Sequence, residues 1–458
     1  MSKPRIEKYD EIALVDSQAY KYINNLSLDE RKFVYYIFRA GLPINRIHRR
    51  QLHRKSLKII ELMKKFYNAM IKHKDYRTND KFNINFKKYL VFILCNHGQY
   101  YQRESRNSKR VPKFSIGDFL RNYMKFVGKK MSLSDEIELL PHIFDISFEK
   151  NLTEQNSIDK SSINLYSHDF TDKDYQHKFN DPVKNEEYQK VKKELNTYYY
   201  KDGNEIKYMK YAIDQWGSEE FKIALHWLNK AHKLIKESLK DKSKESLFGK
   251  NMSDSLRNII KYFETGNENY FKEHSRQWMM HKGKNLDYLY GLIESYDDPM
   301  QIISMIASEV TMKTVNMDEY NNILIKLEKI LPYPINFARD LSDPNLRPPN
   351  VTTNILLHGA GANGPLGITA AYCLPNYNDI RSELGSKQVI YEMDKGLGEQ
   401  LNKELSEHLV TNFGKEIKEK YDKDKELSKD LWKIICLLHE SVGHASGKLD
   451  KHTFKQGE

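Results

Sequence analysis

Several features that would restrict the class of this protein are scarce or missing in its 458 residues. Only three cysteines occur, Cys95, Cys373 and Cys436, and their wide separation excludes a disulfide framework and a cysteine-rich zinc module. No apolar run is long enough to cross a bilayer, and the first residues lack the pattern of a signal peptide. We therefore expect a cytoplasmic protein with reduced thiols and no membrane partner.

Proline and glycine are also scarce, with 13 and 21 residues, so long helices and strands are expected. Hydrophobic residues make up 39% and charged residues 30%, which is a globular balance. The formal charge of +11 comes from 74 Lys and Arg against 63 Asp and Glu. A chain of this length predicts two or three domains.

Local patterns predict two helices near the N-terminus. Ser27 and Glu30 form a capping box in front of apolar residues at helical spacing, and we expect this helix to end at Gly41 and Pro43. The pattern over 44–71 predicts a further amphipathic helix.

Later segments predict a mixture of loops, helices and strands. The polar stretch 151–181 indicates surface loops, and Asp202-Gly203 indicates a hairpin turn. A helical pattern covers 253–271, whereas clustered Gly, Pro and Asn around short apolar runs in 350–389 favour strands and binding loops.

Two candidate binding sites have simpler interpretations. Gly359, Gly361 and Gly364 match the spacing of a dinucleotide loop, but Pro365 follows and no helix pattern begins, so we interpret them as a turn between strands. The basic stretch 46–58 is interpreted as a solvated helix face, and no nucleic-acid partner is expected, because no recognition motif accompanies the charges.

A third candidate is His439-Glu440-Ser441-Val442-Gly443-His444 within an apolar helical pattern. Zinc peptidases with two helical histidines use a spacing of four, whereas the spacing here is five, which turns the second imidazole roughly 140° around an ideal helix. Both rings would reach one metal only if the turn held an extra residue, as in a π-bulge, for which Gly443 is suited. From the spacing alone, the alternative to a metal site is that the two histidines have unrelated roles.

Three motifs in order resemble the dipeptidyl peptidase III family. They are His439-Glu440-x-x-Gly443-His444, the run Leu374-Pro375-Asn376-Tyr377-Asn378-Asp379-Ile380-Arg381, and Gly291-Leu292-Ile293-Glu294-Ser295-Tyr296-Asp297-Asp298-Pro299. That family carries one extra residue between its metal histidines. The resemblance implies a zinc metallopeptidase, bacterial in type, with one zinc ion per chain.

The resemblance also implies a role for each matching residue. His439 and His444 would bind zinc, and Glu440 would act as general base. Glu294 would hold the ammonium group of the substrate, and Tyr296, two positions later, would share its face on a strand and stabilise the oxyanion.

Two further residues of the same motifs would contact the substrate. Asn376 would pair with peptide backbone, and Arg381 would add a cationic donor. The structural alternatives are an ion pair between Glu294 and Arg381, and a turn role for Asn376 after Pro375.

The chain also departs from the family pattern. The family's third zinc ligand is a Glu some tens of residues past the second histidine, whereas this chain ends at Glu458, so we expect that ligand to be missing and zinc to bind weakly. Cys373 stands where the family usually has a substrate-binding Asn, and residues 300–306 replace expected glycines.

The predicted fold is α+β and two-lobed, mostly helical, with a small β-barrel-like lower lobe and an incomplete upper helical lobe. The predicted parts are a lower lobe at 1–317, an upper-lobe excursion at 318–349, lower-lobe strands with the substrate loop at 350–398, and the start of the upper lobe with the zinc motif at 399–458. The predicted function is release of dipeptides from short peptides with a free N-terminus, with activity doubtful without the third ligand. The alternative is a non-catalytic peptide-binding remnant or fragment.

Overall fold

The structure is a computed structural model, and it describes residues 19–101, 108–128, 131–132, 136–179, 195–241, 248–281, 285–316, 350–364, 371–391 and 435–444, with the single positions 326, 330, 415, 416, 419 and 423. The predicted upper-lobe excursion at 318–349 therefore lies almost entirely outside the described residues. No helix in the described part is long and apolar enough to cross a membrane.

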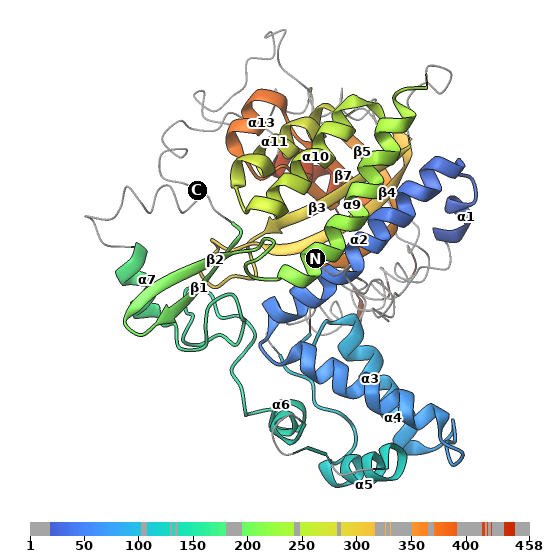
Figure 1. Ribbon diagram of the computed structural model, residues 1–458, viewed down its shortest axis with the longest axis vertical. Coiled ribbons are helices and arrows are strands. Elements are labelled where there is room, and N and C mark those ends of the chain that lie inside the picture. The colour runs from blue at the N-terminus through green and yellow to red at the C-terminus, as the bar shows by residue number, and fades with distance from the viewer. Residues whose placement is uncertain are drawn as a thin grey trace.

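A five-stranded mixed sheet organises the molecule (Figure 1). In spatial order its strands are β3 (Leu286–Glu294), β4 (Met305–Asn316), β5 (Asn350–Gly361), β7 (Lys387–Tyr391) and β6 (Ala371–Leu374). Neighbours are antiparallel except β5 and β7, which are parallel. Strands predicted within 350–389 are thus confirmed. Over the described strands the sheet is open, so the expected barrel-like part has no closed barrel.

Four long helices lie beside this sheet, namely α2 (Leu28–Leu52), α9 (Ser218–Ser238), α10 (Gly249–Thr265) and α11 (Glu268–Met280) (Figure 1). Helix α2 packs on β4 and β5, and α9 packs on α2 and α10. Tyr288 and Tyr290 are alternate residues of β3 and therefore point to one face. The Tyr290 hydroxyl donates to the Ala40 carbonyl at 2.8 Å, and the Tyr288 hydroxyl lies 2.8 Å from Ser255 Oγ. One face of β3 is thereby fixed to both α2 and α10.

The capping box of α2 is confirmed. Ser27 Oγ accepts from the Glu30 N–H at 3.3 Å, and the Glu30 carboxylate accepts from the Ser27 N–H at 2.9 Å. The predicted end at Gly41 and Pro43 is wrong, because α2 continues through Pro43. A proline removes one helical hydrogen bond, and packing of α2 on α9, β4 and β5 offsets that loss. Gly41 permits the close approach, since a Cβ there would lie 3.1 Å from Ala360 Cβ.

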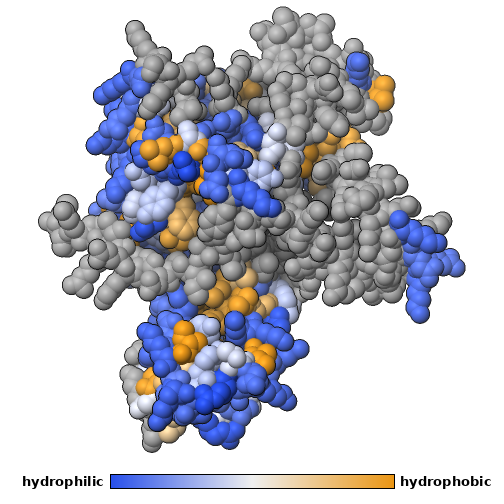
Figure 2. All heavy atoms as spheres, turned by 90° about the vertical axis from the view of Figure 1, so that its right-hand side faces the viewer, coloured by the Kyte–Doolittle hydropathy of each residue, from blue (hydrophilic) through white to orange (hydrophobic). Residues whose placement is uncertain are grey.

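A separate helical unit extends away from the sheet (Figure 1). Its helices are α3 (Ser56–Lys72), α4 (Lys81–Cys95), α5 (Ile116–Val127) and α6 (Leu140–Phe144). Phe66 is central to its aromatic core, with ring centroids 4.7 Å from Phe86 and 5.3 Å from Phe119. Figure 2 shows this unit as a protrusion with a mostly hydrophilic surface. The prediction of a single helix over 44–71 is wrong, because α2 ends at Leu52 and a new helix, α3, begins at Ser56.

Smaller elements follow the sequence signals more closely. The predicted hairpin consists of β1 (Thr197–Asp202) and β2 (Glu205–Lys210), with Gly203 at φ 62° in the turn. The loops predicted in 151–181 lead into the short helix α7 (Asp172–Phe179). Leu165 and Tyr166 from these loops are buried in the main core, so the segment is more than a surface excursion.

The basic stretch 46–58 forms specific ion pairs. Arg46 contacts Glu220 at 3.2 Å and Glu61 at 2.6 Å, and Arg50 contacts Glu220 at 2.6 Å. These pairs connect α2 to α9 and α3. The two arginines therefore have a structural role. The predicted solvated helix face is wrong in part, because Arg49 of the same stretch is only 2% exposed.

A buried carboxyl lies in the middle of the sheet. Glu309 of β4 is 2% exposed, and the Tyr391 hydroxyl donates to both of its oxygens at 2.6 Å. Asn363 Nδ2 donates to Glu309 Oε2 at 2.9 Å. Burial raises the pKa of Glu309 to about 7, against the opposing effect of these donors.

We expect the stability of the protein to fall as the pH rises from 5 to 8 in part because Glu309 ionises inside the fold. An acid with a raised pKa in the folded state favours folding below its unfolded pKa and loses that contribution as the pH passes its folded pKa. The shift from 4.5 to about 7 corresponds to about 3 kcal/mol. Glu309→Gln cannot ionise, so its free energy of unfolding in urea should lack this part of the decline.

The matched control is Glu205→Gln on the exposed hairpin, which should keep the wild-type pH profile. If the free energy of unfolding changed with pH in the same way for wild type and Glu309→Gln, Glu309 would not be the group whose ionisation lowers the stability.

Candidate functional site

The two histidines of the third motif converge through an unusual helical turn. Residues 439–443 form the π-helix η4 (His439–Gly443), and the His444 N–H donates to the His439 carbonyl at 3.2 Å. This i to i+5 bond accommodates one extra residue in the turn. The Nε2 atoms of the two imidazoles lie 3.1 Å apart, and both side chains are exposed. The extra residue in the turn, which was the condition for both rings to reach one metal, is therefore present.

Glu440, between the histidines, points into the protein and is only 8% exposed. Burial raises the pKa of its carboxyl, and the nearby Glu294 carboxylate raises it further. His439 and Arg381 oppose these effects. Burial also lowers the pKa of His444, and its neighbours His439 and Arg381 lower it further. Residues from all three sequence motifs therefore act on one another electrostatically.

Glu294 is the last residue of β3, and Asn376 holds it. Asn376 Nδ2 donates to Glu294 Oε1 at 3.3 Å and to the Ile293 carbonyl at 3.2 Å. Burial raises the pKa of Glu294, the Asn376 hydrogen bond lowers it, and the Asp297 carboxylate raises it. Asn376, expected to pair with peptide backbone, thus orients the carboxylate in this structure. It is exposed, so its amide oxygen is open to a further partner.

Arg381 lies in the short helix α13 (Asn378–Leu384) and contacts the histidine motif. Its guanidinium donates to the His444 carbonyl, and Nη2 lies 3.7 Å from Cys373 Sγ. A cationic donor at the carboxyl end of a helix satisfies a carbonyl that has no helical partner. Arg381 therefore connects α13 to η4, and no ion pair links it to Glu294.

Tyr296 does not lie on a strand, so the expected shared face with Glu294 is wrong. β3 ends at Glu294, and Tyr296 sits in the following turn with 39% of its surface exposed. The turn arises because Asp298 N–H donates to the Ser295 carbonyl at 3.0 Å and bends the chain away from the sheet.

Sequence reasoning missed the residues that hold α13 in place. Lys272 pairs with Asp379 at 3.0 Å, and Arg276 pairs with Glu383, which ties α13 to α11. The Tyr377 hydroxyl donates to a Glu268 carboxylate oxygen. These partners are more than a hundred residues apart, and no local pattern in the sequence signals them.

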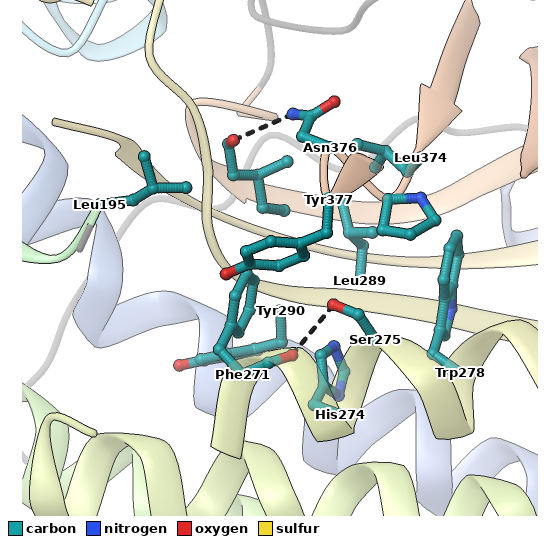
Figure 3. A pocket seen from close by; sticks show the side chains of 12 residues that line it. Leu195, Phe271, His274, Ser275, Trp278, Leu289, Tyr290, Leu374, Asn376 and Tyr377 are labelled. Atoms are coloured by element: carbon teal, nitrogen blue, oxygen red, sulfur yellow. Dashed lines mark hydrogen bonds between the residues drawn. The ribbon is translucent and has the colours of Figure 1, made fainter. Parts of the chain in front are cut away.

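An apolar pocket lies beneath the segment that carries Asn376 (Figure 3). It is lined by Leu195, Phe271, His274, Ser275, Trp278, Leu289, Tyr290, Ile293, Leu374, Pro375, Asn376 and Tyr377. Figure 3 shows Asn376 at its rim, with the amide directed at the Ile293 carbonyl. The cavity of about 30 Å³ admits about two water molecules. It is therefore too small for a large peptide side chain.

A second group of histidines and a carboxylate lies in the helical unit. His53, His142 and Glu149 have ligand atoms within 4.8 Å of one another and could hold a metal ion. Their contacts have hydrogen-bond lengths, because Glu149 Oε1 lies 2.8 Å from His53 Nε2 and 2.7 Å from His142 Nδ1. The Lys55 N–H points at His53 Nδ1 at 3.2 Å, which favours a proton on Nε2. We therefore interpret the group as a hydrogen-bonded cluster in which Glu149 connects His53 and His142, and not as a metal site.

Comparison with known proteins agrees with the arrangement of the three motifs. The sequence model described as Peptidase family M49 matches residues 152–457, which is more than half of the chain. The chain belongs to peptidase family M49, a family of metallopeptidases. The predicted dipeptidyl peptidase III family is thereby confirmed.

The chain is also similar to individual proteins named dipeptidyl peptidase 3. Dipeptidyl peptidase 3 of Nematostella vectensis is 30% identical over 198 residues, covering 42% of this chain and 25% of the relative. The human protein of that name is 29% identical over 219 residues, covering 46% and 27%. The chain thus matches about a quarter of the length of these relatives.

Solved structures confirm the fold class. DPP III from Caldithrix abyssi superposes with a TM-score of 0.54 at 15% identity, covering 86% of this chain and 59% of that one. Dipeptidyl-peptidase III from Corallococcus sp. strain EGB gives a TM-score of 0.53 at 15% identity, with 80% and 55% covered. The helix-rich α+β prediction is therefore correct.

We expect Glu149→Gln to lower the free energy of unfolding by about 2 kcal/mol, because a buried charged acceptor shared by His53 and His142 is lost. Urea unfolding of both proteins measures the difference. Glu138→Gln, which removes an exposed ion pair with Lys55, is the matched control and should have a much smaller effect. A zinc-dependent rise in thermal midpoint seen in wild type but absent from Glu149→Gln would instead assign a metal to this group.

Proposed function

We propose that this chain carries the substrate site and the paired metal histidines of a zinc-dependent exopeptidase that releases dipeptides from short peptides with a free N-terminus. The observation that carries the proposal is the convergence of His439 and His444, whose Nε2 atoms are 3.1 Å apart, beside the carboxylates Glu440 and Glu294. Such a reaction needs a pair of metal-binding histidines and a carboxylate that binds the substrate ammonium in the same site.

The histidine pair suits zinc by its chemistry. Two imidazole nitrogens at this separation, both exposed, match the tetrahedral nitrogen ligands that zinc prefers. When bound, zinc would polarise the scissile carbonyl and lower the pKa of a water molecule. Within the described ranges no third histidine, cysteine or carboxylate forms a metal group with this pair. Zinc affinity therefore reports whether a third ligand is supplied to the site.

The remaining residues would bind the peptide and move protons. Glu440 would accept a proton from the attacking water on its carboxylate, and its buried position raises its basicity. Glu294, oriented by Asn376, would pair with the substrate ammonium and set the cleavage point two residues in. Tyr296 would offer its hydroxyl to the developing oxyanion from the turn after β3.

The second candidate function is peptide binding without turnover. It is favoured by one observation: among the described residues no third side chain joins the two histidines in a metal group, whereas Asn376 Nδ2 donates to Glu294 Oε1 at 3.3 Å. The two candidates differ in metal retention and in hydrolysis but share the recognition of a free N-terminus.

We expect the purified chain, prepared without chelator, to retain more zinc than His439→Ala, because the variant lacks one of the two imidazole ligands. Metal analysis by mass spectrometry measures the ratio of zinc to protein. A ratio near one that falls in His439→Ala supports the metallopeptidase, whereas equal and negligible ratios favour the peptide-binding alternative. His168→Ala, at an exposed position outside the three motifs, is the matched control.

We also expect binding of alanine pentapeptide to depend on its free ammonium group through Glu294. Acetylation of the peptide, or Glu294→Gln in the protein, should each weaken binding by about tenfold or more, since an ion pair with a partly buried carboxylate is lost. Isothermal titration calorimetry of the four combinations measures this. Equal affinity for acetylated and free peptide would refute the role of Glu294.

A further inference from the structure

The loop between β3 and β4 joins two of the proposed functional residues. It begins directly after Glu294, and its first turn contains Tyr296, because the Asp298 N–H donates to the Ser295 carbonyl at 3.0 Å. The position of Tyr296 therefore depends on how Asp298 is held.

Asp298 is completely buried, with 0% exposure, and binds several donors at once. Its Oδ1 accepts from the Met300 N–H at 3.1 Å, and its Oδ2 accepts from the N–H groups of Ile302 at 2.9 Å and Ile303 at 2.8 Å. The Tyr166 hydroxyl donates to the same carboxylate at 3.0 Å. One side chain thus satisfies three backbone amides of the loop.

The carbonyl groups of the same loop bind a second segment, residues 153–156. The contacts are Thr153 Oγ1 to the Asp297 carbonyl at 2.8 Å, the Asn156 N–H to the Pro299 carbonyl at 3.0 Å, and Gln155 Nε2 to the Tyr296 carbonyl at 3.4 Å. Asp298 binds backbone N–H groups of the loop, and residues 153–156 bind its carbonyl groups. Both sets of contacts restrict the conformation of the loop.

The backbone at Gln301 shows how firmly the loop is fixed. Its φ of 57° lies in the left-handed region, which a residue with a side chain rarely adopts. Such a conformation persists only where surrounding contacts determine it. Here Met300 and Ile302, on either side, are both bound by Asp298, and Gln301 Nε2 donates to Gln155 Oε1 at 3.1 Å.

We propose that Asp298 is a positioning residue for peptide recognition, acting through the turn that carries Tyr296 and through the end of β3 that carries Glu294. The inference rests on the proposed function, because it assigns Asp298 a role in that same site. A carboxylate that must meet a substrate ammonium gains affinity when its backbone is fixed in advance.

The sharpest variant is Asp298→Asn. It keeps the size of the side chain but replaces one acceptor oxygen by an NH₂ donor, which must face backbone N–H groups that it cannot satisfy. Thr153→Val is a second variant, because it removes the hydroxyl donor to the Asp297 carbonyl and leaves Asp298 intact. Asp202→Asn, on the exposed hairpin, is the matched control.

The experiment measures two quantities in the 458-residue chain. Hydrogen exchange at the amides of residues 300–303 reports the loop, and calorimetry gives the ratio of the dissociation constants for acetylated and free alanine pentapeptide. A general loss of stability would not change this ratio, whereas displacement of Glu294 would. We expect Asp298→Asn to speed exchange at these amides and to reduce the ratio about tenfold, Thr153→Val to do both more weakly, and Asp202→Asn to do neither.

The outcomes separate the two proposals. Faster exchange at 300–303 with an unchanged ratio would overturn the positioning role of Asp298 and leave the proposed function standing. If wild type itself does not distinguish the two peptides, the recognition of a free N-terminus fails first, and the positioning role fails with it. Should Asp298→Asn not fold, Thr153→Val alone decides, because its exchange and its ratio are expected to change together.

Discussion

The hydrogen bond from the His444 N–H to the His439 carbonyl is the contact on which the site depends. It lengthens one helical turn by a residue, so two imidazoles that an ideal helix would turn away from each other meet with their Nε2 atoms 3.1 Å apart. The same turn directs Glu440 inward, where burial raises the pKa of its carboxyl. Two adjacent exposed imidazoles and a sheltered carboxyl group thus arise from one local distortion.

The rest of the fold brings side chains of the other two motifs to this turn. The end of β3 supplies Glu294, the segment after β6 supplies Asn376, and α13 supplies Arg381, which donates to the His444 carbonyl. Ion pairs between α11 and α13, with the apolar pocket of Figure 3, hold that segment in place. Burial and the Glu294 carboxylate raise the pKa of Glu440, and the Arg381 guanidinium opposes that rise.

Buried carboxyl groups recur as structural centres in this protein. Asp298 binds three backbone amides of one loop, Glu149 accepts from two histidines, and Glu309 is held by Tyr391 inside the sheet. Each is buried with its acceptor capacity satisfied, which is the condition under which a buried carboxyl is tolerated. The basic residues of α2 serve a similar purpose, because they are paired with carboxylates of neighbouring helices.

The sequence by itself determined the features that depend on neighbouring residues. The capping box at Ser27, the hairpin turn at Gly203 and the extra residue between His439 and His444 could all be predicted, because short-range hydrogen bonding and helical periodicity control them. Only the tertiary structure decided that α2 continues through Pro43, that Tyr296 leaves the strand, that Asn376 orients Glu294 and that Arg381 contacts η4. Those outcomes depend on packing between segments far apart in the chain, where burial and satisfied polar groups outweigh local preference.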